Sequence, residues 1–228
     1  MKVLITGAGR GYGLALAQQF STHANHMVLV VRSQSQQADL LKRFDNASVL
    51  LADISDGGYV EQLAQHLANH LGDSQLDLMI NNAGTAAHAP TLATTTTAAM
   101  TREFNSHCLG AVHTVQGSLA ALSVGATIIN ISSRFGSLSR QASGVAKGCS
   151  YSYRMAKAAQ NMFTLALVDE FPQFTSVAIH PGRLLTELAS PDAHLTPQAS
   201  AERLLALYQS GSLKSGQFIS LEDGELAW

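Results

Sequence analysis

A glycine-rich turn near the amino end constrains the fold of this chain more than any other feature. The turn stands between a short apolar run, residues 3–5, and a segment from Leu14 that has apolar residues at helical spacing. Glycines at such a junction permit a tight turn and let the backbone approach a pyrophosphate at the helix amino terminus. They are Gly7, Gly9, Gly11 and Gly13. The segment predicts a dinucleotide-binding βα unit, and the alternative is an ordinary turn between strand and helix.

Short apolar runs and longer amphipathic segments alternate along the rest of the 228 residues. We expect strands at residues 3–5, 27–31, 49–51, 76–80, 127–131, 177–179 and 217–219, and helices from 14 and at 38–44, 59–71, 98–122, 152–170 and 199–208. Such alternation implies a parallel sheet with helices on both faces. The predicted fold class is α/β, a doubly wound parallel (Rossmann) sheet of about seven strands. No linker divides the chain, so residues 1–228 are expected to form a single domain.

Composition and charge exclude several other functions. The net charge is −2, which gives no electrostatic case for binding nucleic acid or an anionic membrane. The first apolar run is too short for a signal peptide, and no run approaches the length of a membrane span, so we expect a soluble, cytoplasmic protein. Cys108 and Cys149 are too isolated to indicate a disulfide or a zinc site. His66 and His70 are spaced like metal ligands, but a polar helix face explains them better, and no metal is predicted.

A tyrosine and a lysine four residues apart, Tyr153 and Lys157, share one face of an expected helix. The ammonium would favour the phenolate, because a nearby opposite charge lowers the pKa of an acid from its usual value of about 10. The phenol would then serve as a proton donor and acceptor. The spacing alone is weak evidence, since such pairs occur by chance on many helices.

The residues after the second expected strand bear on the choice of dinucleotide. An acid there would accept a hydrogen bond from the ribose 2′-hydroxyl of NAD, but this chain has Arg32 and Ser33. A guanidinium favours a 2′-phosphate by its charge and its forked donors, and Arg10 adds a second cation. NADP(H) is therefore favoured over NAD(H). The alternative is that both arginines are solvated surface residues.

Six motifs in order resemble the short-chain dehydrogenase/reductase family over nearly the whole chain. They are the turn with Thr6, Gly7, Gly11 and Gly13, the Asn-Asn-Ala-Gly run from Asn81 to Gly84, Asn105, Ser133, the Tyr153–Lys157 pair, and Pro181, Gly182 and Thr186. Within the family, the run at 153–161 and the closing residues 216–228 are most similar to the C-factor and sniffer-like carbonyl reductases.

The resemblance implies a role for each motif residue. Tyr153 would exchange a proton with a carbonyl or alcohol, Lys157 would lower the Tyr153 pKa and bind the nicotinamide ribose, and Ser133 would orient the substrate oxygen. Asn105 would hold a water that connects Lys157 to solvent. Asp53 would bind the adenine amino group and Thr186 the carboxamide. The residues expected to bind the cofactor are Gly7, Gly9, Arg10, Gly11, Tyr12, Gly13, Arg32, Ser33, Asp53, Ile54, Asn81, Ala83, Gly84, Pro181, Gly182, Leu184 and Thr186.

Other polar residues near these motifs are less convincing candidates. A surface position or a hydrogen-bonded core position explains His107 and His113 better than a ligand site, and contact of His180 with a ligand is the minority interpretation. Tyr151 lacks a lysine four residues later. Ser132 is expected to point away from the side that Ser133 faces, because neighbouring strand residues alternate.

Two departures from the family concern the substrate. The polar surplus at 137–144 is expected to form a loop at the mouth of the site. The stretch after Thr186 is short, which predicts a small lid and an open pocket. Thr85, Phe135, Leu184 and Leu188 suggest an apolar wall, but no residue identifies the substrate.

Three functions fit these residues. The favoured hypothesis is an NADP(H)-dependent oxidoreductase that reduces a small ketone or aldehyde or oxidises a secondary alcohol. The first alternative is an NADP(H)-binding sensor or signalling protein of the C-factor type, and the second is an epimerase or dehydratase. A homodimer or tetramer through helices 98–122 and 152–170 is compatible with the sequence, and so is a monomer.

Overall fold

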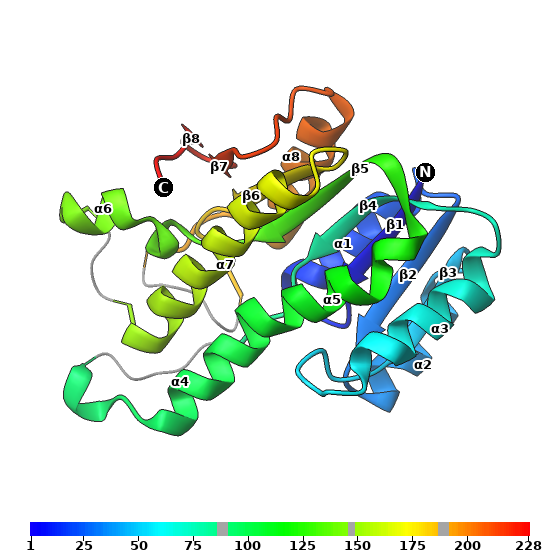
Figure 1. Cartoon of the computed structure of the whole chain (residues 1–228), viewed down its shortest axis with the longest axis horizontal. Coiled ribbons are helices and arrows are strands. Elements are labelled where there is room, and N and C mark those ends of the chain that lie inside the picture. The colour runs from blue at the N-terminus through cyan, green and yellow to red at the C-terminus, as the bar shows by residue number, and fades with distance from the viewer. Residues whose placement is uncertain (86–90, 146–148, 187–191) are drawn as a thin grey trace.

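The computed structural model describes residues 1–85, 91–145, 149–186 and 192–228, and these form an eight-stranded sheet in the order β3-β2-β1-β4-β5-β6-β7-β8 (Figure 1). The strands are β1 Lys2–Thr6, β2 His26–Val31, β3 Ala47–Leu51, β4 Leu76–Asn81, β5 Leu122–Ile131, β6 Thr175–His180, β7 Phe218–Ser220 and β8 Gly224–Glu225. Neighbouring strands from β3 to β7 are parallel, and β8 runs antiparallel to β7 at the edge. The predicted doubly wound parallel sheet is confirmed, with one short edge strand added.

Helices cover both faces of this sheet. They are α1 Gly11–Ser21, α2 Gln34–Arg43, α3 Tyr59–Leu71, α4 Thr97–Phe104, α5 Gly110–Ser118, α6 Leu138–Ala142, α7 Tyr151–Glu170 and α8 Pro197–Gln209. Alternate residues of β1 enter different cores, because successive side chains of a strand point to opposite faces. Val3 and Ile5 pack with Leu16 of α1, whereas Leu4 packs with Leu63 of α3. The central strands are therefore apolar on both faces, as expected for a buried parallel sheet.

The order of the strands reverses between β1 and β4, in the middle of the sheet. From β1 the chain first builds outward through β2 and β3, and it then continues from β4 on the other side of β1. In open α/β sheets, ligands bind in the crevice outside the carboxyl ends of the strands at such a switch point. The glycine turn after β1 and the Asn-Asn-Ala-Gly run at the end of β4 meet at this place.

Two helices and a π-helical turn replace the single long helix expected at residues 98–122. The π-helical turn, Asn105–Leu109, lies between α4 and α5, and the Gly110 amide donates to the Asn105 carbonyl five residues back. Gly110 packs closely on the loop after β3, since a Cβ there would lie 2.4 Å from the Ile54 Cδ1 atom. The apolar pattern continues across the break, so the sequence does not reveal it. The end of the predicted helix was also wrong, because β5 begins at Leu122, which pairs with Leu76.

Part of the polar surplus at 137–144 is a helix, α6, and not the expected loop. The Ser137 side chain accepts a hydrogen bond from the Arg140 amide and so caps the helix. The last residues of the chain lie beside it: Ser137 Oγ donates to the Ala227 carbonyl, and the Ser139 amide donates to the Trp228 carbonyl at 2.9 Å. These long-range contacts, which no local pattern encodes, order the segment.

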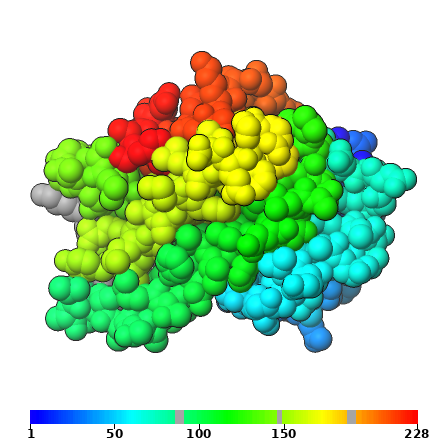
Figure 2. Space-filling view, in the orientation of Figure 1, coloured from blue at the N-terminus to red at the C-terminus, as the bar shows by residue number. Residues whose placement is uncertain are grey.

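Helices α3, α4, α5 and α7 form one broad face of the molecule, and Figure 2 shows their side chains packed side by side over it. Exposed apolar side chains on α4 and α7 include Phe104, Met155 and Met162. Among the described helices, none combines the length and apolar character needed to cross a membrane.

Candidate active site

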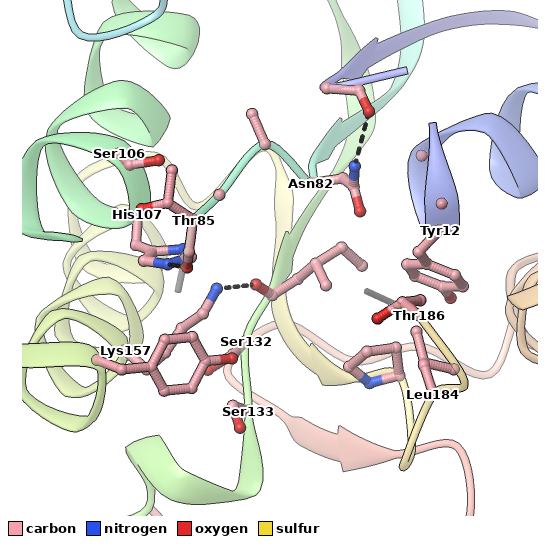
Figure 3. Close-up of a pocket in the computed structure, with 18 of the residues that line it drawn as sticks. Tyr12, Asn82, Thr85, Ser106, His107, Ser132, Ser133, Lys157, Leu184 and Thr186 are labelled. Atoms are coloured by element: carbon pink, nitrogen blue, oxygen red, sulfur yellow. Dashed lines mark hydrogen bonds between the residues drawn. The ribbon is translucent and has the colours of Figure 1, made fainter. Parts of the chain in front are cut away.

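A large pocket opens at the carboxyl edge of the sheet, at the switch point between β1 and β4. Its volume is about 1650 Å³, and its lining comes from the glycine turn and from the ends of β2, β4, β5 and β6, together with α4 and the start of α7. Figure 3 shows Tyr12, Leu184 and Thr186 on one side of the pocket and His107 and Lys157 on the opposite side. The pocket therefore brings together the segments that the sequence motifs singled out.

Hydrogen bonds hold the glycine turn against the segment after β4. Thr6 Oγ1 accepts from the amides of Asn82 and Ala83, both at 3.1 Å, and Asn82 Nδ2 donates to the Thr6 carbonyl at 3.0 Å. Gly7 has a φ of 69°, and a Cβ there would lie 2.8 Å from the Ala83 Cα atom. A side chain on Gly13 would lie 2.0 Å from the Gly7 carbonyl oxygen. Gly7 therefore requires glycine for both conformation and space, and Gly13 requires it for space.

An arginine and an aspartate stand at the end of the pocket beside β2 and β3. Arg32 and Asp53 lie 4.0 Å apart, with side chains 62% and 46% exposed. Burial raises the pKa of Asp53, but hydrogen bonds from Ser55 and the charge of Arg32 outweigh it, so the pKa lies below its usual range. Arg10 also lines the pocket. This end can offer positive charge to a phosphate, and Asp53 can accept a hydrogen bond.

Tyr153 and Ser133 meet at the other end of the pocket. Ser133 follows β5, and Tyr153 lies in the first turn of α7, where its amide donates to Ser150 Oγ at 3.3 Å. The two side chains lie close together, and Ser133 lowers the Tyr153 pKa against the larger effect of burial. Ser132 faces elsewhere and donates to Asn161 Oδ1 at 2.5 Å. The expected alternation of the two serines is therefore found, although both line the pocket.

Lys157 is buried, and its ammonium is held by groups other than the Tyr153 hydroxyl. Nζ donates to the Ile131 carbonyl at 2.6 Å and to Gln160 Oε1 at 2.9 Å, and it lies 5.8 Å from the centre of the Tyr153 ring. Burial lowers the pKa of Lys157 to about 7, against the attraction of Glu103.

The expected lowering of the Tyr153 pKa by Lys157 is not found. Burial raises the pKa of Tyr153 above its usual range, and the hydrogen bond with Ser133 offsets only part of that effect. The physical reason is that Lys157 turns toward the Ile131 carbonyl, so its charge lies over the ring and not beside the hydroxyl. The four-residue spacing fixed a shared helix face but not this orientation.

Most of the predicted site residues line this pocket. The lining includes Asn105, Ser133, Tyr153 and Lys157, and from the expected cofactor set Gly7, Gly9, Arg10, Gly11, Tyr12, Gly13, Arg32, Asp53, Ile54, Ala83, Gly84, Pro181, Gly182, Leu184 and Thr186. Two expected residues are not in it. Asn81 is buried in the sheet and donates to Asn130 Oδ1 at 2.9 Å, and the Ser33 hydroxyl is exposed and bonded to that of Ser35.

The wall proposed for the substrate is only partly apolar. Thr85, Phe135 and Leu184 line the pocket, whereas Leu188 lies outside the described residues. Asp192, which follows that gap, accepts from Arg134 Nη2 at 2.8 Å. This ion pair joins the segment after β6 to the segment after β5, and both residues line the pocket.

Sequence reasoning missed the polar residues that α4 and the π-helical turn bring to the pocket. His107 lines it, and Glu103 lies fully buried behind His107. His107 is the hydrogen-bonded core histidine that the sequence favoured, but its place beside Tyr153 and Lys157 was not foreseen. The signal was a glutamate and a histidine one turn apart on a helix with few charges, the spacing at which helical side chains meet.

No group of metal-binding side chains is found among the described residues. The rings of His66 and His70 stack at 4.1 Å, and His66 Nε2 is hydrogen-bonded to Ser48 Oγ at 3.0 Å.

Comparisons with known proteins identify the family of the chain. Residues 1–194 match the short chain dehydrogenase family. C-signal of Myxococcus xanthus is 32% identical over 166 residues, which cover 71% of this chain and 98% of that protein. The NADPH-bound carbonyl reductase from chicken fatty liver is 27% identical, with a TM-score of 0.89 over 100% of this chain and 98% of that one. The carbonyl reductase Sniffer of D. melanogaster is 25% identical, with a TM-score of 0.88 over 100% of this chain and 99% of that one.

The chain therefore belongs to the short-chain dehydrogenase/reductase family, and its structure is similar to those of carbonyl reductases. The family and the likeness to C-factor and sniffer-like proteins, both expected from the motifs, are confirmed.

Proposed function

We propose that this member of the short-chain dehydrogenase/reductase family is an NADP(H)-dependent oxidoreductase that reduces a small ketone or aldehyde, or oxidises the corresponding secondary alcohol. The observation that carries the proposal is that Tyr153, Ser133 and Lys157 line the same pocket as the glycine turn. A proton donor, a hydrogen-bonding hydroxyl and a buried cation thus stand beside a backbone cradle suited to a pyrophosphate.

The residues of the pocket fit a nicotinamide dinucleotide. The glycine turn exposes backbone that side chains would otherwise cover, and the pocket volume of about 1650 Å³ leaves room for cofactor and substrate together. Arg10 and Arg32 would hold a 2′-phosphate, Asp53 the adenine amino group, and Lys157 the nicotinamide ribose. When bound, a reduced nicotinamide supplies a hydride to the carbonyl carbon.

The side chains of this chain supply the proton. As the carbonyl carbon gains its electrons, the Tyr153 O–H bond breaks and a new O–H bond forms on the product oxygen. Burial holds the Tyr153 pKa above its usual range, so the hydroxyl carries its proton at neutral pH but is a weaker acid, and the phenolate must be stabilised as the proton leaves. Ser133 would hydrogen-bond the same oxygen, and the charge of Lys157 would stabilise the phenolate. Asn105, in the π-helical turn, would hold a water that reconnects Lys157 with solvent.

The choice of NADP(H) over NAD(H) is tested by binding alone. NADPH fluorescence is titrated with the protein, and the dissociation constant is compared with that of NADH. We expect tighter binding of NADPH, because Arg10 and Arg32 meet the extra phosphate. Equal affinities would contradict the assignment.

The reaction is tested with a panel of small ketones and aldehydes. The decay of NADPH absorbance is followed with each carbonyl, and the alcohol product is identified. We expect turnover with at least one of them. Oxidation of a secondary alcohol with NADP⁺ is measured in the same way.

A second candidate function is that of an NADP(H)-binding sensor or signalling protein with little turnover. The similarity to C-signal favours it. Tight NADPH binding without turnover on any carbonyl or alcohol would support it. The presence of Asn105, Ser133, Tyr153 and Lys157 in one pocket argues against it, because a protein that only binds has no need of a proton donor.

We further propose that two copies of the chain associate through α4 and α7. The support is that Phe104, Met155 and Met162 are 47%, 55% and 64% exposed on these two packed helices. Sedimentation of the purified protein tests it. A dimer or tetramer is expected, and Met162→Glu should favour the monomer. A wild-type monomer at micromolar concentration would contradict the proposal.

A further inference from the structure

A carboxylate and an imidazole are buried together behind the catalytic residues. Glu103 lies in the last turn of α4, one turn before His107, and the two residues are 0% and 4% exposed. Thr85 Oγ1 donates to Glu103 Oε1 at 3.0 Å, and His107 Nε2 lies 3.2 Å from Glu103 Oε2 and 2.7 Å from the Thr85 carbonyl. Charged residues are rarely buried so completely unless they are paired. We call Glu103 and His107 the buried pair.

The contacts of the buried pair determine which ring nitrogen of His107 carries the hydrogen. His107 Nε2 faces a carbonyl and a carboxylate, which only accept, so Nε2 carries the hydrogen. Nδ1 has no hydrogen-bonding partner among the described residues and lies against Gly84, where a Cβ would be 2.6 Å away. Burial and the charge of Lys157 lower the pKa of His107 to about 4, so the ring is neutral at pH 7.

Glu103 therefore brings one negative charge to this place. Burial opposes ionisation of Glu103, but hydrogen bonds from His107 and Thr85 hold its pKa below its usual range. The pair as a whole carries that charge, since His107 is neutral.

The buried pair contacts Tyr153 through His107 and lies near Lys157. The His107 ring meets the Tyr153 ring edge-on, with centres 5.3 Å apart and planes at 89°. Figure 3 shows His107 and Lys157 close together on the same side of the pocket. Among the residues that the structure describes, the titratable groups that interact with Glu103 or His107 are Arg102 from α4, Cys149 before α7, and Tyr153 and Lys157 from α7.

We propose that Glu103 and His107 are positioning residues of the active site: they hold the Tyr153 ring edge-on and place a fixed negative charge beside Lys157. The charge keeps Lys157 protonated at a pH where burial would otherwise neutralise it, and so sets the upper pH limit of activity. This inference rests on the proposed function for its effect on catalysis, but the charge of Lys157 can be measured without turnover.

The first test is an NMR titration of the lysine side chains in isotopically labelled protein without cofactor. The Lys157 resonance is assigned from its loss in Lys157→Met. We expect Glu103→Gln to lower the Lys157 titration midpoint by on the order of one pH unit, the scale of an effect from one nearby opposite charge. Glu103→Asp keeps the charge and should stay close to wild type. Glu61→Gln removes an exposed charge from α3 and should leave the midpoint unchanged.

Two results would overturn the proposal. One is a Glu103→Gln midpoint that coincides with wild type. The other is a shift in Glu103→Asp as large as that in Glu103→Gln, which would mean that packing and not charge is responsible. If Glu103→Gln fails to fold, His107→Leu provides the second variant, because it removes the donor that favours the carboxylate. A smaller shift in the same direction is expected, and no shift would count against the pair.

Wild-type protein supplies a test that needs no variant of the pair. The ring-proton chemical shifts of His107 are followed as the pH is lowered, and they should show that the ring stays neutral down to pH 6. Titration of His107 near pH 6.5, the usual pKa of histidine, would contradict the proposal.

The pH profile of kcat/KM links the pair to catalysis. In Glu103→Gln the loss of activity at high pH should begin about one unit lower than in wild type, and Glu103→Asp should restore it. A profile that does not move while the Lys157 midpoint does would refute the catalytic part of the inference. If the wild type reduces no carbonyl, the proposed function fails, while the NMR titration still decides the role of the pair.

Discussion

The two ends of the pocket, the proposed dinucleotide end at the glycine turn and the proposed catalytic end at Tyr153, consist of different kinds of residue. At the first, the contacts are largely those of the backbone and of small residues: glycines in the turn, and Thr6 and Asn82 that tie it to the segment after β4. At the second, buried ionisable side chains dominate, with Lys157 at 4% and Glu103 at 0% exposure. A backbone cradle depends on the absence of side chains, whereas a buried charge depends on every neighbour that compensates it.

The difference predicts how each end responds to mutation. Substitutions at the glycine turn should weaken cofactor binding, because the added side chains clash with the backbone. Substitutions at the end with Tyr153 and Lys157 should lower the rate of the reaction, because proton transfer is lost or pKa values shift, while the cofactor still binds.

Tyr153→Phe should have the largest effect on activity. Removal of the hydroxyl eliminates the proton donor, and we expect kcat to fall by about 10³-fold or more. NADPH affinity, from fluorescence titration, should stay within roughly twofold of wild type, since the aromatic ring remains. Turnover that survives the change would show that another group donates the proton.

Ser133→Ala should lower kcat by about 10²- to 10³-fold, because it removes a hydrogen bond to the oxygen where charge develops. Ser132→Ala is the matched control: its hydroxyl bonds Asn161, so we expect a loss of about 1–3 kcal/mol in the free energy of unfolding and less than a tenfold change in kcat. Steady-state kinetics and urea unfolding measure the two quantities. Similar effects of both variants on kcat would contradict the roles assigned to the serines.

Gly13→Ala tests the backbone cradle. Its Cβ would lie 2.0 Å from the Gly7 carbonyl oxygen, so the turn must shift. We expect the NADPH dissociation constant to rise about tenfold or more and the free energy of unfolding to fall by about 1–3 kcal/mol. Gly57→Ala is the control, since a Cβ there would meet nothing within 4 Å. NADPH bound as tightly by Gly13→Ala as by wild type would place the pyrophosphate elsewhere.

Arg32→Gln should have the smallest effect. Its side chain is 62% exposed, so solvent screens the charge, and we expect the NADPH dissociation constant to rise roughly five- to tenfold with that of NADH unchanged. Arg43→Gln, at the exposed end of α2 and outside the pocket, should change neither. Equal losses of NADPH and NADH affinity would show that Arg32 does not bind the 2′-phosphate.

The sequence predicted more of the dinucleotide end than of the catalytic end. Gly7 and Gly13 could be recognised because the close approach of neighbouring backbone leaves no space for a side chain. The π-helical turn at Asn105 was missed, because it depends on the packing of Gly110 against Ile54 and leaves the apolar pattern intact. The helix α6 was missed for a similar reason, since residues at the far end of the chain order it.

The sequence by itself determined which chemical groups are present and in what order along the chain: alternating strands and helices, a glycine turn after the first strand, and a tyrosine and lysine on one helix face. Those features are local, because they depend on interactions between residues that are close together in the sequence. Only the tertiary structure decided which way Lys157 points, that Glu103 and His107 lie behind Tyr153, and how far burial shifts their pKa values. Desolvation and charge interactions depend on every atom that surrounds a group, and those atoms come from distant parts of the chain.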